Sequence, residues 1–167
     1  MTTESTLTRI PENTSFLQPT KFTLVFPNLP FLRYFGQTAV IPGISTSPVS
    51  METPFSNTWR HGDKLVYDIF SINAIIDEDM RTWEETYKWM LSYTKPQEFS
   101  QYRDGRNYPD AVLTINTNAN IPNLRFKFTN THPISMGGVN FSTTENANTI
   151  LTVDIQFRYD YYELLRN

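Results

Sequence analysis

The chain has 167 residues, a net charge of −3 and no cysteine. This length fits one domain with a real core, whereas the charge argues against a nucleic-acid-binding domain and the missing cysteines exclude disulfides, thiolate zinc sites and cysteine nucleophiles. Threonine (22) and asparagine (14) far outnumber glycine (6), and because threonine favours strands and asparagine favours turns, the composition predicts a mainly β domain.

The N-terminal segment, residues 1–19, is polar and is predicted to be flexible or ordered by a partner. Phe16 and Leu17 are its candidate partner-binding anchor. The segment lacks the basic and apolar runs of a secretory signal, and no apolar run in the chain reaches the length of a membrane span. We therefore expect assembly in a cytoplasm without a membrane partner, with residues 20–167 as the single domain.

The first half of that domain predicts strands separated by turns. Apolar residues alternate over residues 21–26, which is typical of a half-buried strand. A second strand, over residues 35–41, ends at the strong turn signal Pro42-Gly43. A long strand over residues 64–76 has apolar residues on both faces, which places it in the centre of a sheet or between a core and a neighbouring subunit.

Between the last two strands lies a polar arm, residues 45–63, with little core pattern. Pro48 and Pro54 argue against central sheet pairing in the arm. An arm of this length is not needed to close a barrel. It indicates a chain that builds part of its structure with other copies of itself.

A helix is predicted after the long strand. Asp77 or Asp79 can cap it, and the acids of the segment suit the positive end of a helix dipole. The apolar residues that follow have helical spacing and predict one stripe packed against the core. This core stripe comprises Met80, Trp83, Tyr87, Met90 and Leu91.

The second half predicts a polar loop over residues 95–110 and then more strands. Three of these cover residues 111–117, 124–130 and 134–141. The last, over residues 149–161, alternates most regularly, with apolar side chains on one face and polar side chains on the other. The polar face is expected to meet water, a lumen or a polar subunit contact.

No pattern in the chain predicts catalysis. His61 beside Asp63 fits an acid–base or metal pair, but a hydrogen-bonded loop histidine explains it better, and the same holds for His132. The acids at 77–79 lack the ligand spacing of an EF-hand. Phosphate-loop, dinucleotide, nucleophile-elbow and zinc-protease motifs are missing from the sequence. We expect no enzyme activity, no metal and no cofactor.

The order of these features resembles the tail-tube proteins of contractile-tailed bacteriophages, over about residues 20–162. The best matching points are the turn at 40–44, the helix at 77–90 and the aromatic end at 159–162. The resemblance implies a β-barrel or sandwich flanked by one α-helix, with six copies in a ring. It also implies that rings stack into a hollow tube with a continuous inner β-barrel and an often acidic lumen.

By the same resemblance, residues 45–63 would reach the neighbouring ring. Trp59 would be a plausible anchor, because tryptophan is enriched at interface hot spots; the alternative is that it folds back on its own barrel. The N-terminal segment would bind the sheath or a baseplate component, or be simply disordered. The residues expected in the arm contact are Thr46, Pro48, Met51, Phe55, Trp59, Arg60, His61 and Asp63.

The leading hypothesis is a virion structural protein whose hexameric rings form the inner tail tube and conduct DNA during ejection. Its partners would be copies of itself, the tail sheath, the baseplate and the tape-measure protein, with DNA passing the lumen without specific binding. A baseplate tube initiator and a tail terminator are alternatives with the same fold. An alternative of another class is a β-sandwich carbohydrate or receptor-binding module that uses loop aromatics. Those aromatics would be Tyr93, Phe99, Tyr102 and Tyr108.

Overall fold

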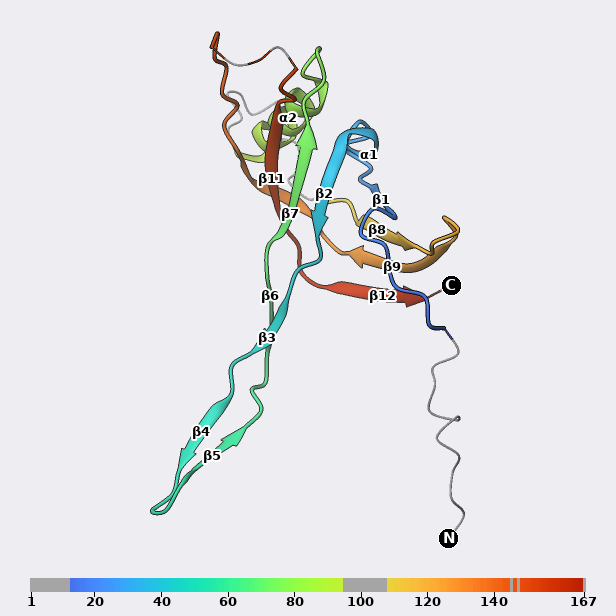
Figure 1. Cartoon of the computed structure of the whole chain (residues 1–167). Helices are drawn as coiled ribbons and strands as arrows, with labels where there is room; N and C mark the ends of the chain where they lie inside the picture. Colours follow the sequence, from blue (N-terminus) through green and yellow to red (C-terminus); the bar gives the residue numbers. More distant parts are fainter. Residues whose placement is uncertain (1–12, 95–107, 145, 147, 167) are drawn as a thin grey trace.

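The computed structural model describes residues 13–94, 108–144, 146 and 148–166. Within them, two four-stranded antiparallel sheets form a body, and a long hairpin arm projects from one end of the body (Figure 1). The predicted fold class is confirmed, because the chain is mainly β with a flanking helix and a long arm between two body strands.

Sheet A joins strands from both ends of the domain in the order β1-β8-β9-β12. Leu24, Leu113 and Phe126 lie side by side in register and are buried, so every second residue of these strands faces the core. The strands β1, β8 and β9 confirm the strands predicted over residues 21–26, 111–117 and 124–130, with ends that differ by at most about two residues. The strands of sheet A are β1 (Phe22–Val25), β8 (Ala111–Asn116), β9 (Pro122–Phe128) and β12 (Tyr162–Arg166).

Sheet B has the order β10-β11-β7-β2. Its core face carries Phe70, Ile72, Val153 and Ile155, all buried. The predicted strand over residues 134–141 instead lies at 132–136 and ends before two glycines. The strands of sheet B are β2 (Gly36–Val40), β7 (Phe70–Ile75), β10 (His132–Met136) and β11 (Thr152–Arg158).

The predicted strand over residues 64–76 is two strands. The chain leaves sheet B at Asp68 and Ile69, and the residues before this point belong to the arm. There the backbone N–H of Asp68 donates to the carbonyl of Gly43 (3.0 Å), which joins the two sides of the arm at its base. Strand-like apolar residues lie on both sides of Asp68, so the sequence pattern does not reveal that the strand is interrupted there.

The predicted strand over residues 149–161 is also divided. β11 ends at Arg158, and the chain then crosses to sheet A and continues as β12. Two backbone hydrogen bonds hold the crossing, from Thr129 N–H to the carbonyl of Tyr161 and from Asp160 N–H to the carbonyl of Thr129, both 3.0 Å. This corner links the two layers of the body.

Two helices lie on the body in the described residues: α1 (Leu32–Phe35) and α2 (Arg81–Thr94). The short α1, whose Leu32 is buried, was not predicted. The predicted cap of α2 is confirmed, because the Asp77 carboxylate accepts hydrogen bonds from the N–H groups of Arg81 (3.2 Å) and Thr82 (3.3 Å). The Asp77 side chain thus accepts hydrogen bonds from two of the backbone N–H groups that have no partner inside the helix at its start.

The predicted core stripe of α2 is not the face that is fully buried, although Trp83 packs against the core. The face of α2 that is fully buried carries Thr82, Thr86 and Trp89. Small threonines let the helix approach the sheet closely, and the Thr86 hydroxyl donates to the Thr82 carbonyl (2.9 Å), which satisfies it inside the helix. Of the predicted stripe, Tyr87 is exposed (44%), and Met80, Trp83, Met90 and Leu91 are only partly buried.

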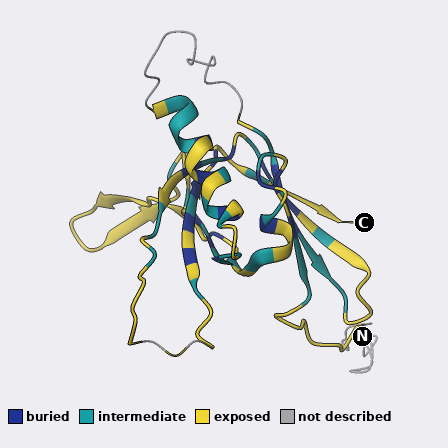
Figure 2. Cartoon of the chain, turned by 90° about the horizontal axis from the view of Figure 1, so that it is seen from above, coloured by how far each residue is buried: buried dark blue, intermediate teal, exposed yellow. Residues whose placement is uncertain are grey.

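Aromatic rings fill the space between the sheets. Phe26 lies against Phe157 with ring centroids 4.6 Å apart, and Phe70 stacks on Phe128 at 4.4 Å. Trp89 places α2 over the core face of sheet B, with its ring 6.2 Å from that of Phe157. Figure 2 shows the buried residues gathered in the body, whereas the arm is exposed along its length. No helix of the described residues has the length and apolarity needed to cross a membrane.

Because Phe157 is buried between both sheets and α2, we expect Phe157→Ala to lower the free energy of unfolding by about 3–5 kcal/mol. Urea unfolding followed by circular dichroism measures this loss. The matched control is Phe55→Ala at the tip of the arm, where the ring is 99% exposed and the change should stay within about 0.5 kcal/mol. Equal losses at the two sites would contradict this account of the core.

Candidate subunit interfaces

The arm is a two-stranded hairpin with no core of its own. Its base pairs β3 (Ile44–Thr46) with β6 (Leu65–Tyr67), and its outer part pairs β4 (Val49–Glu52) with β5 (Asn57–Arg60). The tip contains Phe55, and the Thr53 hydroxyl closes the tip by donating to the carbonyl of Ser56. A hairpin of this kind is marginally stable alone, so the arm is suited to bind a surface outside its own chain.

All eight residues predicted for the arm contact are exposed and lie between β3 and β6. Trp59 is 66% exposed and stands opposite Ser50 on one face, while Met51 stands opposite Thr58 on the other. Trp59 therefore does not fold back on the body. Exposed apolar side chains on both faces of a thin hairpin are typical of an interaction surface. The structure brings the eight residues onto one element, and their role in a contact stays a prediction.

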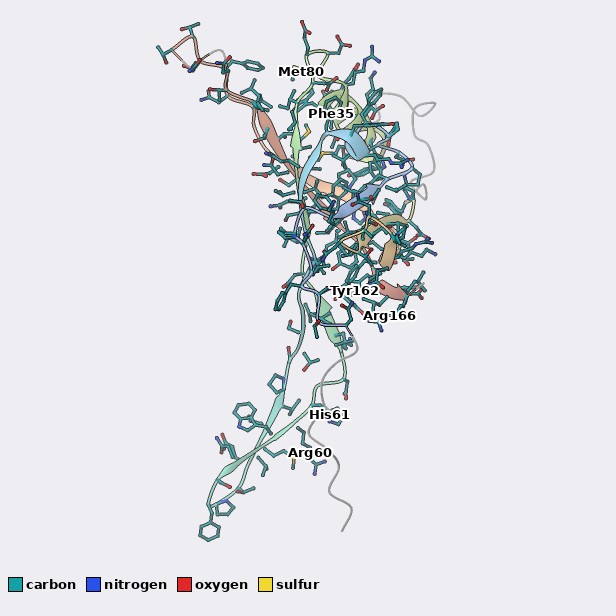
Figure 3. All side chains as sticks on the ribbon, turned by 45° about the vertical axis from the view of Figure 1, so that its right-hand side comes forward. Phe35, Arg60, His61, Met80, Tyr162 and Arg166 are labelled. Atoms are coloured by element: carbon teal, nitrogen blue, oxygen red, sulfur yellow. The ribbon has the colours of Figure 1, made fainter. Side chains whose placement is uncertain are left out.

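One glycine allows the two sides of the arm to meet. A Cβ atom at Gly62 would lie 2.1 Å from the carbonyl oxygen of Ser47, which no side chain permits. His61 and Asp63 flank this contact and are exposed. Figure 3 labels Arg60 and His61 on the arm, far from the body. The close backbone contact between Gly62 and Ser47 explains why the residue at position 62, before β6, is a glycine.

An aromatic cluster holds the base of the arm to the body. The ring of Tyr67, in β6, lies 5.9 Å from Tyr159 and 5.5 Å from Tyr162, between centroids. The hydroxyl of Tyr159 donates to the carbonyl of Asp68 (2.9 Å), and that of Tyr162 donates to the carbonyl of Pro42 (3.5 Å). Burial raises the pKa of Tyr159, and nearby Tyr162 and Asp68 raise it further. The arm is thus anchored at the corner where the chain crosses between the sheets.

A second candidate interface is formed by the outer strands of sheet B. In the described residues, β10 pairs only with β11 and β2 pairs only with β7. Each outer strand therefore offers one edge of unpaired backbone groups. Because successive strands alternate in direction, β2 and β10 run in opposite directions at the two edges. The β2 edge of one copy can consequently pair antiparallel with the β10 edge of another.

The face of sheet B that points away from the core is polar. Asp154 accepts a hydrogen bond from the side-chain amide of Asn73 (2.6 Å) across β11 and β7. On β11 the polar face has one acid, Asp154, and one base, Arg158. This is the polar face that the alternation over residues 149–161 predicts. The residues of this face on β7 and β11 are Ser71, Asn73, Ile75, Thr152, Asp154, Gln156 and Arg158, of which only Ile75 is apolar.

The proposed N-terminal anchor also lies on the surface. Phe16 is 90% exposed and Leu17 is 67% exposed. Together with the turn between β8 and β9 they line an open groove of about 370 Å³. Their role in binding a partner stays a prediction.

The titratable groups of the described residues do not form a metal site or a catalytic cluster. No group of three or more potential metal ligands occurs there. His61 is exposed on the arm, and His132 begins β10 with its ring 4.9 Å from that of Tyr108. The ion pair with Lys127 (2.9 Å) holds the pKa of Asp110 below its usual range. Desolvation raises the pKa of Glu85 on α2, where capping Asp77 adds to the effect.

Two of the four loop aromatics of the binding-module alternative, Tyr93 and Tyr108, lie in the described residues and pack against each other. Tyr93 and Tyr108 face each other edge to face, and the Tyr93 hydroxyl donates to the carbonyl of Pro133. Burial raises the pKa of Tyr93 to about 12. Phe99 and Tyr102 lie outside the described residues. In the part that is described, these aromatic rings join α2 to β10.

Deleting residues 46–60 should leave the body folded, because none of these residues belongs to the core. We expect the melting temperature of the deletion variant to stay within a few degrees of the full chain, while the contact of a ring with its axial neighbour is lost. Differential scanning calorimetry and analytical ultracentrifugation measure the two quantities. An unfolded product would mean that the arm belongs to the folding unit.

The tyrosines at the arm base predict a loss of stability at alkaline pH. A tyrosine whose folded pKa lies above the unfolded value of about 10 stabilises the fold fully below pH 10 and loses this contribution as the pH rises further. Tyr159→Phe should therefore cost about 0.5–1.5 kcal/mol at neutral pH, from the lost hydrogen bond, and should flatten the decline above pH 10. Urea unfolding from pH 8 to pH 11 tests this, with Tyr34→Phe at an exposed site as the control.

Comparisons with known proteins agree with this geometry. No family model matches the chain. Over 135 residues the chain is 25% identical to the tail tube terminator protein of Enterobacteria phage T4. The matched region covers 77% of this chain and 76% of that protein. The relationship therefore includes most of the body.

Solved structures of contractile injection systems share the fold. The tube-terminating cap of the anti-feeding prophage superposes with a TM-score of 0.70 at 11% identity, covering 98% of this chain and all of that one. The sheath/tube terminator of the PVC extracellular contractile injection system gives 0.67 at 13% identity, covering 92% and 99%. A chain of the anti-feeding prophage baseplate gives 0.69 at 10% identity, covering 92% and 98%. The sequence relationship and the shared fold together support the predicted resemblance to the tail-tube proteins of contractile systems.

Proposed function

We propose that the chain is a non-enzymatic structural subunit of a contractile tail, and that copies of it form the ring that terminates the inner tube. The observation that carries this proposal is the sequence relationship to the T4 tail tube terminator protein over most of both chains. The sequence alone favours the repeating tube subunit and leaves the terminator as an alternative. The relationship favours the terminator.

The ring would close through the edges of sheet B. Each copy offers β2 on one side and β10 on the other, and the two run in opposite directions. Pairing them repeats one head-to-tail contact around a circle and continues the antiparallel order into a closed barrel. Closure satisfies the backbone groups of the outer strands and leaves sheet B without exposed edges. We propose six copies, as the family resemblance implies.

The polar face of sheet B would line the lumen of this ring. Sheet A and α2 cover the opposite face, so only the polar face is free to point inwards. On its two central strands, the charges of Asp154 and Arg158 balance. Such a lumen would differ from the acidic one that the resemblance implies, but it would equally lack a basic patch that retains DNA. DNA would pass through without specific binding.

The arm would make the contact along the tail axis. It extends beyond the body and exposes Trp59, Phe55 and Met51 to a neighbour (Figure 1). For a terminator, that neighbour would be the last ring of the tube, and the sheath would surround both. Contacts of the N-terminal segment with the sheath or a baseplate component, and of the lumen with the tape-measure protein, belong to the same proposal.

Electron microscopy of the purified protein, with its mass measured in solution, tests this function. A terminator should give six-fold rings that do not grow into tubes at high concentration, and should cap tubes of the tail's own tube protein at one end. Long hollow tubes of this chain alone would instead show a repeating tube subunit. A chain that stays monomeric even with the tube present would contradict a ring of either kind.

A further inference from the structure

An apolar groove of about 380 Å³ lies between the start of α2 and the chain that leaves β10. Met80 and Trp83 form the side contributed by the helix, and Met136, Val139 and Phe141 form the other. Phe141 is 69% exposed, so the groove is open to solvent in the isolated subunit. Thioether and aromatic side chains together suit an aromatic ring, around which methionine adapts its shape.

Met80 lines this groove with a strained backbone conformation. Its φ of 53° lies in the left-handed region, which a glycine adopts without strain and a methionine does not. The backbone of Met80 helps to start the helix. Its N–H donates to the carbonyl of Asp77, and the Met80 carbonyl accepts from the N–H of Glu84, both at 2.9 Å. Neither hydrogen bond requires the methionine side chain. A side chain kept where glycine would be easier points to a use for that side chain, which is to form the wall of the groove.

The middle of the groove is empty at Gly138. A Cβ atom added there would meet no atom within 4 Å, and the backbone at this residue is not in the left-handed region. The space beside Gly138 is therefore available to a side chain from outside the subunit.

Tyr34 is the aromatic residue that the opposite edge of sheet B offers. It lies in α1, immediately before β2, and is 82% exposed. In the described residues it has no ring contact and no side-chain hydrogen bond. Figure 3 labels Phe35, its neighbour in sequence, and Met80, both at the end of the body away from the arm. Tyr34 and the groove thus lie at the same level on opposite edges of sheet B.

Strand register brings the two together between copies. β2 (Gly36–Val40) and β10 (His132–Met136) have equal lengths, and at the ring contact they run antiparallel. When they pair over their whole length, the start of β2 at Gly36 lies beside the end of β10 at Met136. Tyr34, just before β2, is then brought next to the open part of the groove at Gly138, just after β10.

We propose that Tyr34 of one copy docks into the Met80–Trp83–Phe141 groove of the next copy and fixes the position of neighbouring subunits in the ring. This contact rests on the proposed ring function. It seals the ring on its outer side, behind the strand edges, and buries an aromatic ring of the size that commonly anchors protein interfaces. The occupant of the groove is thus a second copy of this chain.

Disulfide cross-linking tests the contact, because the chain has no cysteine of its own. Residues opposite each other on paired antiparallel strands are within disulfide reach. The variant Thr38→Cys/Ile134→Cys, which keeps Tyr34, should form, on mild oxidation, a ladder of linked subunits on a denaturing gel. A second variant, which adds Tyr34→Ala to this pair, should form the ladder more weakly at the same concentration.

The two variants separate the possible failures. Equally strong ladders with and without Tyr34 would overturn the groove contact, whereas the ring would still be supported by the strand-edge cross-link and by its measured mass. Monomers with no cross-link in either variant, even with the tail tube present, would overturn the ring and the contact with it.

Two single variants measure how much the contact contributes. Tyr34→Ala should weaken ring assembly at least about tenfold, since it removes the anchor, and Gly138→Val should do the same by filling the groove. Both should leave the melting temperature of the subunit unchanged, because neither side chain packs in the body. Tyr161→Ala, at another exposed tyrosine, is the control that should assemble normally. Normal assembly of the two groove variants would contradict the proposal.

Discussion

The hydrogen bond from Tyr159 to the carbonyl of Asp68 joins the two places where the chain changes direction. At Asp68 the chain passes from the arm into sheet B, and at Tyr159 it leaves sheet B for sheet A. Around this bond the ring of Tyr67 packs against Tyr159 and Tyr162, and these two rings in turn pack against Phe128 of the core. The orientation of the arm, the spacing of the sheets and the start of the last strand therefore depend on a single aromatic corner.

The sequence predicts the elements of this fold well but not the points where they break. Periodicity identified the strands around Leu24, Leu113 and Ile155, because burial on one face leaves a period of two. The same periodicity runs through Asp68 and Tyr161, since each side of a break still alternates, and only tertiary pairing decides which sheet receives the residues. The Tyr–aromatic ending was visible as a pattern, but its hydrogen bond to a carbonyl more than ninety residues earlier was not.

The candidate interfaces show the same division. The arm was recognisable because a polar segment with prolines lies between two apolar strands, and its length had no explanation within one subunit. The inner face of α2 was not recognisable, because Thr82 and Thr86 are small and polar and give no apolar signal, although they are buried. Tyr34 and Gly138 also carry no pattern in the sequence. Their significance comes from strand register, which is a property of the sheet edges and not of either residue.

The arm has a consequence for the lifetime of unassembled subunits. Two strands without a core open readily, and an opened segment of about fifteen exposed residues is an accessible substrate for cellular proteases. Contact with another ring would hold the two strands together and protect the arm from cleavage. Subunits that find no tube would be trimmed at the arm and lose the ability to bind one, so degradation would remove surplus copies selectively and spare those already built into a tail.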